Sequence, residues 1–275
     1  MPGSQAFEAN SGPVTLSGEA AGSGPAIVLL HGLTATRRYV VMGSRLLERG
    51  GLQVLAYDAR GHGESSPAPD SAAYAYSDLA ADLGAVLDHH GLERAVLAGG
   101  SMGAHTAAAF ALAQPERVAG LVAVTPASTG EPSGELAEWD ALADGLERDG
   151  VDGFLAAWRP EVGERWLDTV YTVARQRLER HRHPAAVADA LRAVPRSTPF
   201  DGLESLGGID VPALVVGSRD EADPSHPLAV AQSWAEHLPD AELAVEEPGA
   251  SPLAWQGAQL SRAILDFLAR RGLDG

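Results

Sequence analysis

Short apolar runs separated by amphipathic stretches constrain the fold of this chain more than any other feature of its sequence. The runs are rich in Val, Leu and Ala without a clean alternation of polar and apolar residues, a pattern typical of strands covered on both faces. This order of runs and helical stretches predicts an α/β fold with a doubly wound, mostly parallel sheet. Ligands of such sheets bind outside the carboxyl ends of the strands. The expected strands are 26–32, 52–58, 94–100, 119–125, 212–218 and 241–247, and the expected helices are approximately 38–49, 73–90, 102–114, 227–238 and 257–271.

Residues 130–200 break this order, because they show helical patterns punctuated by Gly and Pro and no strand pattern. An insertion that leaves from the carboxyl end of a strand lies over the edge where ligands bind. We therefore expect a helical cap, and the alternative is a helical subdomain without a role in binding. The predicted division is a core of residues 1–129 and 201–275 and a cap of residues 130–200.

Composition and charge exclude several classes of function. The 275 residues carry a formal net charge of −17, which repels phosphate backbones and anionic lipids, so we expect no nucleic-acid partner and no membrane partner. The absence of cysteine excludes disulfides and a thiolate nucleophile. The N-terminus lacks a secretory signal pattern, and the apolar runs are too short to span a bilayer. We therefore expect a cytoplasmic protein that binds a small-molecule substrate or ligand under the cap, and its oligomeric state is unknown from the sequence.

Residues 99–103 read GGSMG and match the pattern G-x-S-x-G, with Ser101 at its centre. The motif follows an expected strand and opens an expected helix, which is the context of a nucleophile elbow. Glycine suits the sharp turn, since side chains flanking the serine would collide with neighbouring backbone. The helix N-terminus favours negative charge that develops near the hydroxyl. The alternative is an ordinary strand-to-helix turn in which the serine caps the helix.

With three further segments, this elbow makes the chain resemble proteins of the α/β-hydrolase fold with a cap, which include esterases, lactonases and C–C bond hydrolases. The resemblance spans approximately residues 12–130 and 200–272. It is specific for the fold and not for a substrate. The three segments are "VLLHGLTAT" (28–36), "YDARGHGESS" (57–66) and "VPALVVGSRDEADP" (211–224).

The resemblance implies a set of catalytic residues. Ser101 would be the nucleophile, and the backbone N–H groups of Leu33 and Met102 would form the oxyanion hole. Asp220 matches the position of the acid, which orients and stabilises an imidazolium in this family, and Asp223 is the second choice. No cofactor is implied. No pair among the nine histidines shows a metal-binding spacing with a carboxylate partner, so we expect no metal.

The base of this family is missing from its usual place. After the last expected strand the family carries a histidine, whereas this chain has Gly-Ala-Ser-Pro at 249–252, and no histidine follows His237. Either Ser251 replaces the histidine or a Gly-His pair has been deleted. A serine hydroxyl is a poor nucleophile until a base removes its proton. The candidate substitutes for the base are Glu246, Glu247 and His226.

The other histidines are expected at structural or surface positions, His31 and His62 from the resemblance and the rest from their places in the expected helices. We expect His31 and His62 to brace loops and His105 to pack beneath the elbow, and we expect no imidazole between Ser101 and Asp220. The function predicted is a serine hydrolase of an ester, lactone or related small acyl substrate with an incomplete triad. The alternative is a non-hydrolytic binding protein, pseudo-enzyme, lyase or isomerase on the same fold. The histidines expected on the surface are His89, His90, His181, His183 and His237.

Overall fold

The computed structural model describes residues 3–219, 221–249, 255 and 257–275. Within these ranges the strands form one eight-stranded sheet in the order β1-β2-β4-β3-β5-β6-β7-β8. The strands from β3 onward pair in parallel, and β1 and β2 join the edge as an antiparallel hairpin. The strands are β1 (Gln5–Ser11), β2 (Val14–Ala21), β3 (Ala26–Leu30), β4 (Gln53–Tyr57), β5 (Ala95–Gly100), β6 (Val118–Val124), β7 (Ala213–Gly217) and β8 (Ala241–Val245).

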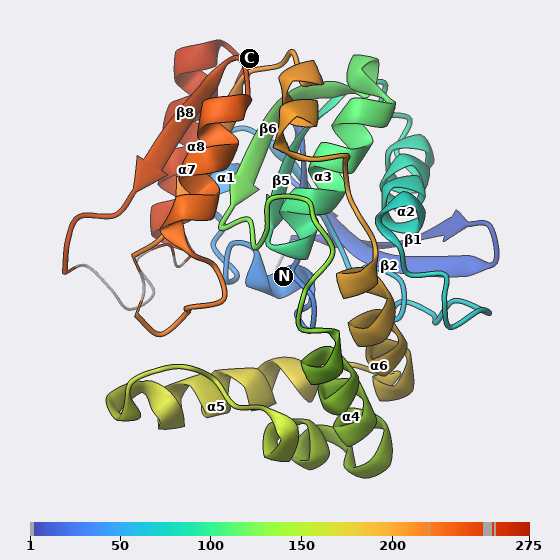
Figure 1. The fold of residues 1–275 in the computed structure, drawn as a ribbon. Helices are drawn as coiled ribbons and strands as arrows, with labels where there is room; N and C mark the ends of the chain where they lie inside the picture. Colours follow the sequence, from blue (N-terminus) through green and yellow to red (C-terminus); the bar gives the residue numbers. More distant parts are fainter. Residues whose placement is uncertain (1–2, 220, 250–254, 256) are drawn as a thin grey trace.

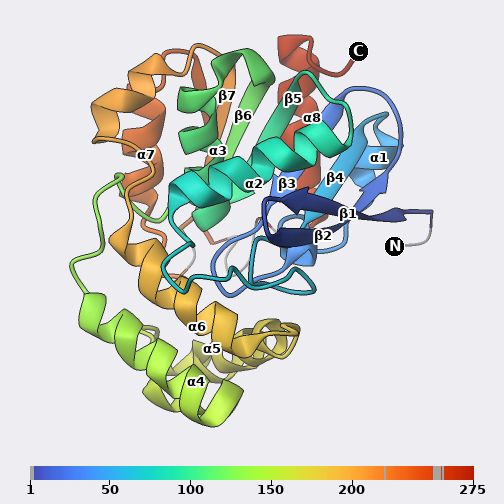
Figure 2. The ribbon, with the colours of Figure 1, turned by 90° about the vertical axis from the view of Figure 1, so that its right-hand side faces the viewer.

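Helices cover both faces of the sheet, as Figures 1 and 2 show. Buried side chains of α2, α3 and α7 pack on one face, and those of α1 and α8 pack on the other. Neighbouring residues of one strand enter opposite layers: Val28 faces the first group of helices and Ile27 the second. The doubly wound α/β fold expected from the sequence is therefore confirmed. The helices are α1 (Leu46–Arg49), α2 (Tyr76–His89), α3 (Met102–Ala113), α4 (Leu136–Ala157), α5 (Glu164–Leu178), α6 (Pro184–Ala193), α7 (Leu228–His237) and α8 (Ala258–Arg271), with 3-10 turns at Arg37–Tyr39, Pro115–Arg117, Val194–Arg196 and Leu203–Gly208.

Two parts of the N-terminal half differ from the sequence prediction. The helix expected at 38–49 is reduced to a 3-10 turn and the four-residue α1. Met42 and Gly43 have φ angles of 47° and 75°, and such left-handed backbone ends a right-handed helix. The hairpin of β1 and β2 was not predicted, because its polar and glycine-containing sequence carries no continuous apolar run. None of the helices in the described ranges combines the length and apolar character that a bilayer crossing requires.

The chain between β6 and β7 forms α4, α5 and α6 and contains no strand, as the sequence predicted for 130–200. In both ribbon views this helical insertion lies beyond the edge toward which the arrows of the parallel strands point (Figures 1 and 2). It has its own apolar cluster, in which Leu142 and Leu146 of α4 pack with Val187 and Leu191 of α6. The boundaries between a core and a cap remain a prediction.

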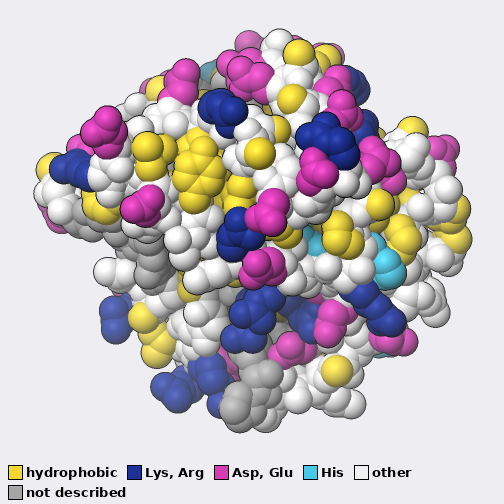
Figure 3. Space-filling model, turned by 90° about the horizontal axis from the view of Figure 1, so that it is seen from below, with side chains coloured by type: hydrophobic (Ala, Val, Ile, Leu, Met, Phe, Trp, Pro, Cys, Tyr) yellow, Lys and Arg dark blue, Asp and Glu magenta, His cyan; other side chains and the backbone are white. Residues whose placement is uncertain are grey.

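Charges on the outer face of the helical insertion are interspersed rather than segregated. Arg192 of α6 pairs with Asp144 and Glu147 of α4 at 2.6 and 2.8 Å, and Arg196 pairs with Asp140 at 2.8 Å. The view from below shows acidic and arginine side chains mixed over this face (Figure 3). The acidic stretch of α4 is thus partly neutralised by arginines from the end of the insertion.

Candidate active site

Ser101 occupies a sharp turn between β5 and α3. Its φ and ψ angles are 51° and −116°, a region that residues other than glycine seldom adopt. The turn is held on both sides: the Ser101 N–H donates to the carbonyl of Val124 at 3.0 Å, and His105 Nδ1 contacts the Ser101 carbonyl at 3.0 Å. A strained backbone that its surroundings fix in this way is typical of functional sites.

Two glycines of the motif are required by close backbone approach. A Cβ added to Gly99 would lie 2.1 Å from the carbonyl oxygen of Gly103, and one added to Gly103 would lie 2.1 Å from the carbonyl oxygen of Leu30. Both distances are far below van der Waals contact. Helix α3 therefore approaches β3 and β5 more closely than any side chain at these positions allows, which raises Ser101 at the sheet edge.

The turn that follows β3 lies directly beside Ser101. A Cβ built on Gly32 would be 3.3 Å from the Ser101 Cβ and 3.9 Å from its Oγ. Among the turn and loop hydrogen bonds of the described chain, none is donated by the backbone N–H of Leu33 or of Met102. Leu33 directly follows Gly32 and Met102 directly follows Ser101, and the role of their N–H groups as oxyanion donors stays a prediction.

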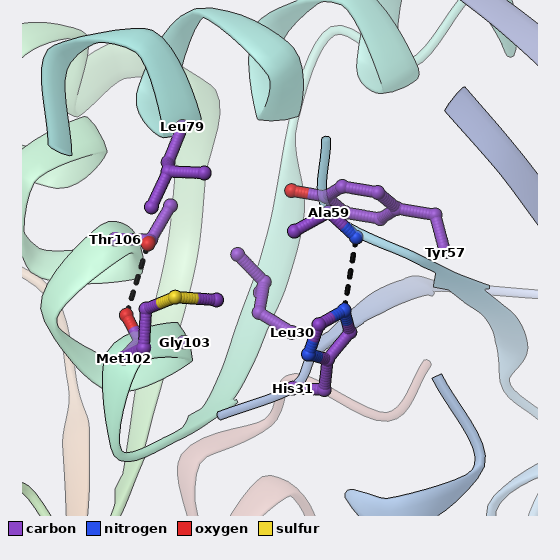
Figure 4. Close-up of a pocket in the computed structure, with 8 residues that line it drawn as sticks. All are labelled: Leu30, His31, Tyr57, Ala59, Leu79, Met102, Gly103 and Thr106. Atoms are coloured by element: carbon purple, nitrogen blue, oxygen red, sulfur yellow. Dashed lines mark hydrogen bonds between the residues drawn. The ribbon is translucent and has the colours of Figure 1, made fainter. Parts of the chain in front are cut away.

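His31 braces these turns through both of its ring nitrogens, as the sequence predicted. Its Nε2 accepts from the Ala59 N–H at 2.9 Å, and its Nδ1 donates to the Gly32 carbonyl at 2.8 Å. Figure 4 shows the imidazole reaching across to Ala59, with the Met102 side chain pointing toward Leu30 and His31. Burial lowers the pKa of His31, against an opposing effect of Asp58, so the ring stays neutral in this role.

His181 is buried, which corrects the expectation that it lies on the surface. It follows α5 and joins the helical insertion to two loops at the sheet edge: its Nδ1 accepts from the Gly63 N–H at 2.8 Å, and its Nε2 donates to the Thr34 carbonyl at 2.9 Å. His62 lies between His31 and His181, with ring centroids 5.2 and 5.4 Å away. The error arose because partners so distant in sequence cannot be inferred from a local polar pattern.

A pocket of about 240 Å³ opens above Ser101. Its wall combines the elbow, the turn after β3, one face of α5 and the segment that follows β7. The space is therefore shared by the sheet edge and the helical insertion. Lining residues with polar or reactive groups include Ser101, Thr125, Arg177, Ser218, Asp223 and His226.

His226 and Asp223 form a hydrogen-bonded pair in this pocket. The Nδ1 atom of His226 lies 2.8 Å from both carboxylate oxygens of Asp223. Burial by itself raises the pKa of Asp223, but the charge and hydrogen bond of His226 and the charge of Arg177 outweigh it and lower that pKa below its ordinary value. Asp223 was the second choice for the acid. Asp220, the first choice, lies outside the described residues. The expectation that no imidazole lies between Ser101 and Asp220 falls on the same residue and stays a prediction.

The two glutamates considered as substitute bases have other positions. Glu246 is buried, and its Oε1 accepts from the Ser218 hydroxyl at 2.9 Å and the Arg219 N–H at 2.5 Å. Glu247 is exposed, and neither side chain lines the pocket. Ser251 lies outside the described residues. In the part of the chain that is described, no group of three His, Asp or Glu side chains is arranged to hold a metal ion.

Arg177 of α5 is a pocket residue that the sequence analysis missed. Its Nε is buried and has no hydrogen-bond partner among the described residues, while the charge of Asp223 in the same pocket acts on the guanidinium. Burial lowers the pKa of Arg177 and the charge of Asp223 opposes this, but an arginine remains protonated at neutral pH. The sequence places Arg177 one helical turn after Val173, but only the structure shows that this face of α5 lines the pocket.

These features define a fold with a serine elbow at the carboxyl edge of its sheet. The model of the α/β-hydrolase fold family matches residues 25–209, and the chain belongs to that family. The sequence is similar to the putative carbamate hydrolase RutD of Variovorax paradoxus, with 32% identity over 263 residues that cover 92% of this chain and 94% of that protein.

One further relative and two solved structures are similar to this chain. A 2-hydroxy-6-oxononadienedioate/2-hydroxy-6-oxononatrienedioate hydrolase of Paraburkholderia phymatum is 34% identical over 229 residues, which cover 80% of this chain and 77% of that one. Among solved structures, a thermophilic esterase from Thermogutta terrifontis superposes with a TM-score of 0.80 at 25% identity, covering 98% of this chain and all of the other. An enol-lactonase from Burkholderia xenovorans shares the fold with a TM-score of 0.78 at 22% identity, over 96% of this chain and 100% of that one.

Proposed function

We propose that this protein is a serine hydrolase in which the Ser101 hydroxyl attacks the acyl carbon of an ester, lactone or related small substrate. The observation that carries the proposal is the strained Ser101 turn, which borders a pocket beside the Gly32 turn. The similarity to hydrolases that act on a carbamate and on a dienedioate, and to an esterase, supports the same class of reaction.

The backbone around Ser101 supplies the electrostatic part of this reaction. Attack by the hydroxyl oxygen turns the acyl carbonyl into a tetrahedral intermediate with a negatively charged oxygen. The N–H groups of Leu33 and Met102 stabilise that charge, at about 3 kcal/mol for each donor. The N-terminus of α3 adds favourable potential at the same point. The leaving group then departs, and water releases the acyl group from Ser101.

The helical insertion acts as a cap over this reaction. Val173 and Arg177 of α5 line the pocket opposite the sheet edge, so substrate bound at Ser101 is enclosed between the two parts. A volume of about 240 Å³ lies below the range of about 300–1,000 Å³ common for drug-sized ligands, which favours small acyl substrates.

Arg177 gives the pocket a preference for a substrate that carries a carboxylate. The buried Nε of Arg177 has no hydrogen-bond partner among the described residues, and an anionic ligand group would accept its hydrogen bond and add to the opposing charge of Asp223. The dienedioate named for the Paraburkholderia phymatum relative has two carboxylates, which fits this preference. We therefore expect acyl substrates with a free carboxylate to be hydrolysed faster than neutral ones of equal size.

Labelling with a fluorophosphonate and a matched ester panel test the proposal. The wild type should be labelled, Ser101→Ala should not, and short esters bearing a carboxylate should be preferred over their neutral methyl-capped analogues. Arg177→Leu should remove this preference by raising KM for the anionic esters alone. Arg175→Leu is the matched control, since Arg175 lies on the same helix but pairs with Asp152 outside the pocket. Absence of both labelling and hydrolysis in the wild type would refute the proposal.

A further inference from the structure

The proposed reaction needs a base for the Ser101 hydroxyl, and the chain has no histidine after His237. We propose that His226 is this general base and that Asp223 is its acid partner, so that both are supplied by the segment between β7 and α7. This inference rests on the proposed hydrolase function. It moves the base from the segment after β8 to the segment after β7 while the order serine, aspartate, histidine along the chain is kept.

The hydrogen bond between the two side chains prepares His226 for proton transfer. Asp223 accepts from Nδ1 at 2.8 Å, so the proton of the neutral ring is on Nδ1 and the lone pair is on Nε2. The described part of the chain provides no hydrogen-bond partner for Nε2. The low pKa of Asp223 keeps its carboxylate ionised, which stabilises the imidazolium that forms.

The position of the pair favours His226 over the other histidine of the pocket. His226 and His31 both line the cavity that contains Ser101. Both ring nitrogens of His31 are engaged by backbone groups, so it has no free lone pair. His105 is also occupied, because its Nδ1 contacts the Ser101 carbonyl at 3.0 Å and its Nε2 contacts the Ser128 carbonyl at 3.2 Å.

A third residue positions the segment without touching the substrate pocket. Glu246, at the end of β8, holds Ser218 and Arg219 immediately after β7. A backbone bond from His226 to Asp223, at 3.3 Å, closes the turn that carries the pair. The start of this segment is thereby hydrogen-bonded to Glu246 beside β8, and its end is closed by the turn from Asp223 to His226.

The proton follows a closed path in this mechanism. As the bond from Ser101 Oγ to the acyl carbon forms, the hydroxyl proton moves to His226 Nε2. The imidazolium then gives that proton to the leaving oxygen as the carbon–oxygen bond of the ester breaks. In the second half, water gives a proton to Nε2 as it attacks the acyl-enzyme, and Ser101 takes the proton back.

Replacement of His226 tests the inference by kinetics. His226→Ala should lower kcat by about 10⁶-fold with little change in KM, and slow fluorophosphonate labelling of Ser101 strongly. Added imidazole should restore part of the activity of His226→Gly, an effect that a merely structural histidine would not show. Asp223→Asn should lower kcat in the same direction. His237→Ala is the control, because that ring lies on α7 outside the pocket and should leave kcat unchanged.

The outcomes separate the inference from the proposed function. If Ser101→Ala abolishes hydrolysis while His226→Ala retains most of it, or imidazole rescues nothing, the base is elsewhere and the hydrolase assignment stands. If the wild type neither labels nor hydrolyses any ester of the panel, both fail. Circular dichroism of His226→Ala and a parallel His226→Gln variant exclude a folding defect as the cause of lost activity.

Discussion

Acidification should lower the free energy of unfolding, because His181 is buried at the junction between the helical insertion and the sheet. Its Nδ1 accepts from the Gly63 N–H and its Nε2 donates to the Thr34 carbonyl. Only the neutral ring can make both bonds, since an imidazolium has no lone pair. Uptake of a proton therefore replaces one hydrogen bond by a repulsive contact between two donors.

The size of this effect follows from the pKa of His181. Burial lowers that pKa from the ordinary 6.5 to about 4 in the folded chain. A lowered histidine pKa stabilises the fold fully above pH 6.5, and the contribution is lost as the pH falls toward 4. At 1.36 kcal/mol for each unit, the 2.5-unit difference corresponds to about 3 kcal/mol, of which about 2 kcal/mol is lost by pH 5.

Urea unfolding followed by tryptophan fluorescence measures this contribution. The free energy of unfolding is measured for the wild type and His181→Asn at pH 7 and at pH 5. For each protein the loss between pH 7 and pH 5 is calculated. Subtracting one loss from the other cancels the titration of groups common to both proteins. The wild type should lose about 2 kcal/mol more than the variant. His183→Asn, two residues further on, should keep the wild-type difference. Equal losses in the wild type and His181→Asn would show that the imidazole is not held neutral by its burial.

Two further predictions concern packing around the site. Asp82→Asn removes the carboxylate charge 2.7 Å from the buried Arg60 guanidinium and leaves only its longer ion pair with Asp78 at 3.4 Å. The free energy of unfolding in urea should fall by about 1–3 kcal/mol, and an unchanged value would contradict this. Gly103→Ala places a methyl group against the Leu30 carbonyl and should cost about 1–3 kcal/mol while slowing fluorophosphonate labelling, whereas unchanged stability would mean that α3 can move away from β3.

The strands of the parallel sheet were predictable because burial on both faces leaves a continuous apolar run in the sequence. Ile27 and Val28 enter opposite apolar layers, so the whole run is apolar and visible in the sequence. The failed helix at 38–49 shows the limit of such patterns. Met42 has a positive φ there, and nothing in an amphipathic pattern reports on a single left-handed residue. The edge hairpin was missed because a strand with one exposed side needs no apolar run.

The features of the site likewise divide into those that local sequence predicts and those that depend on distant contacts. The Ser101 elbow could be predicted because its glycines meet the requirements of a tight local turn. The burial of His181 could not, since its partners Gly63 and Thr34 are 118 and 147 residues away. The pair of Asp223 and His226 is local, and the spacing of three residues hinted at it. Its arrival in the same pocket as Ser101 depends on the tertiary structure alone.

The short separation of Asp223 and His226 has an evolutionary consequence. When acid and base come from different loops, two distant parts of a chain must be conserved together for either to be useful. In the proposed mechanism one turn of four residues, 223–226, carries both. Such a turn can be inherited, lost or grafted onto another member of the family as a single unit. In the proposed mechanism the segment after β8 contributes no catalytic side chain.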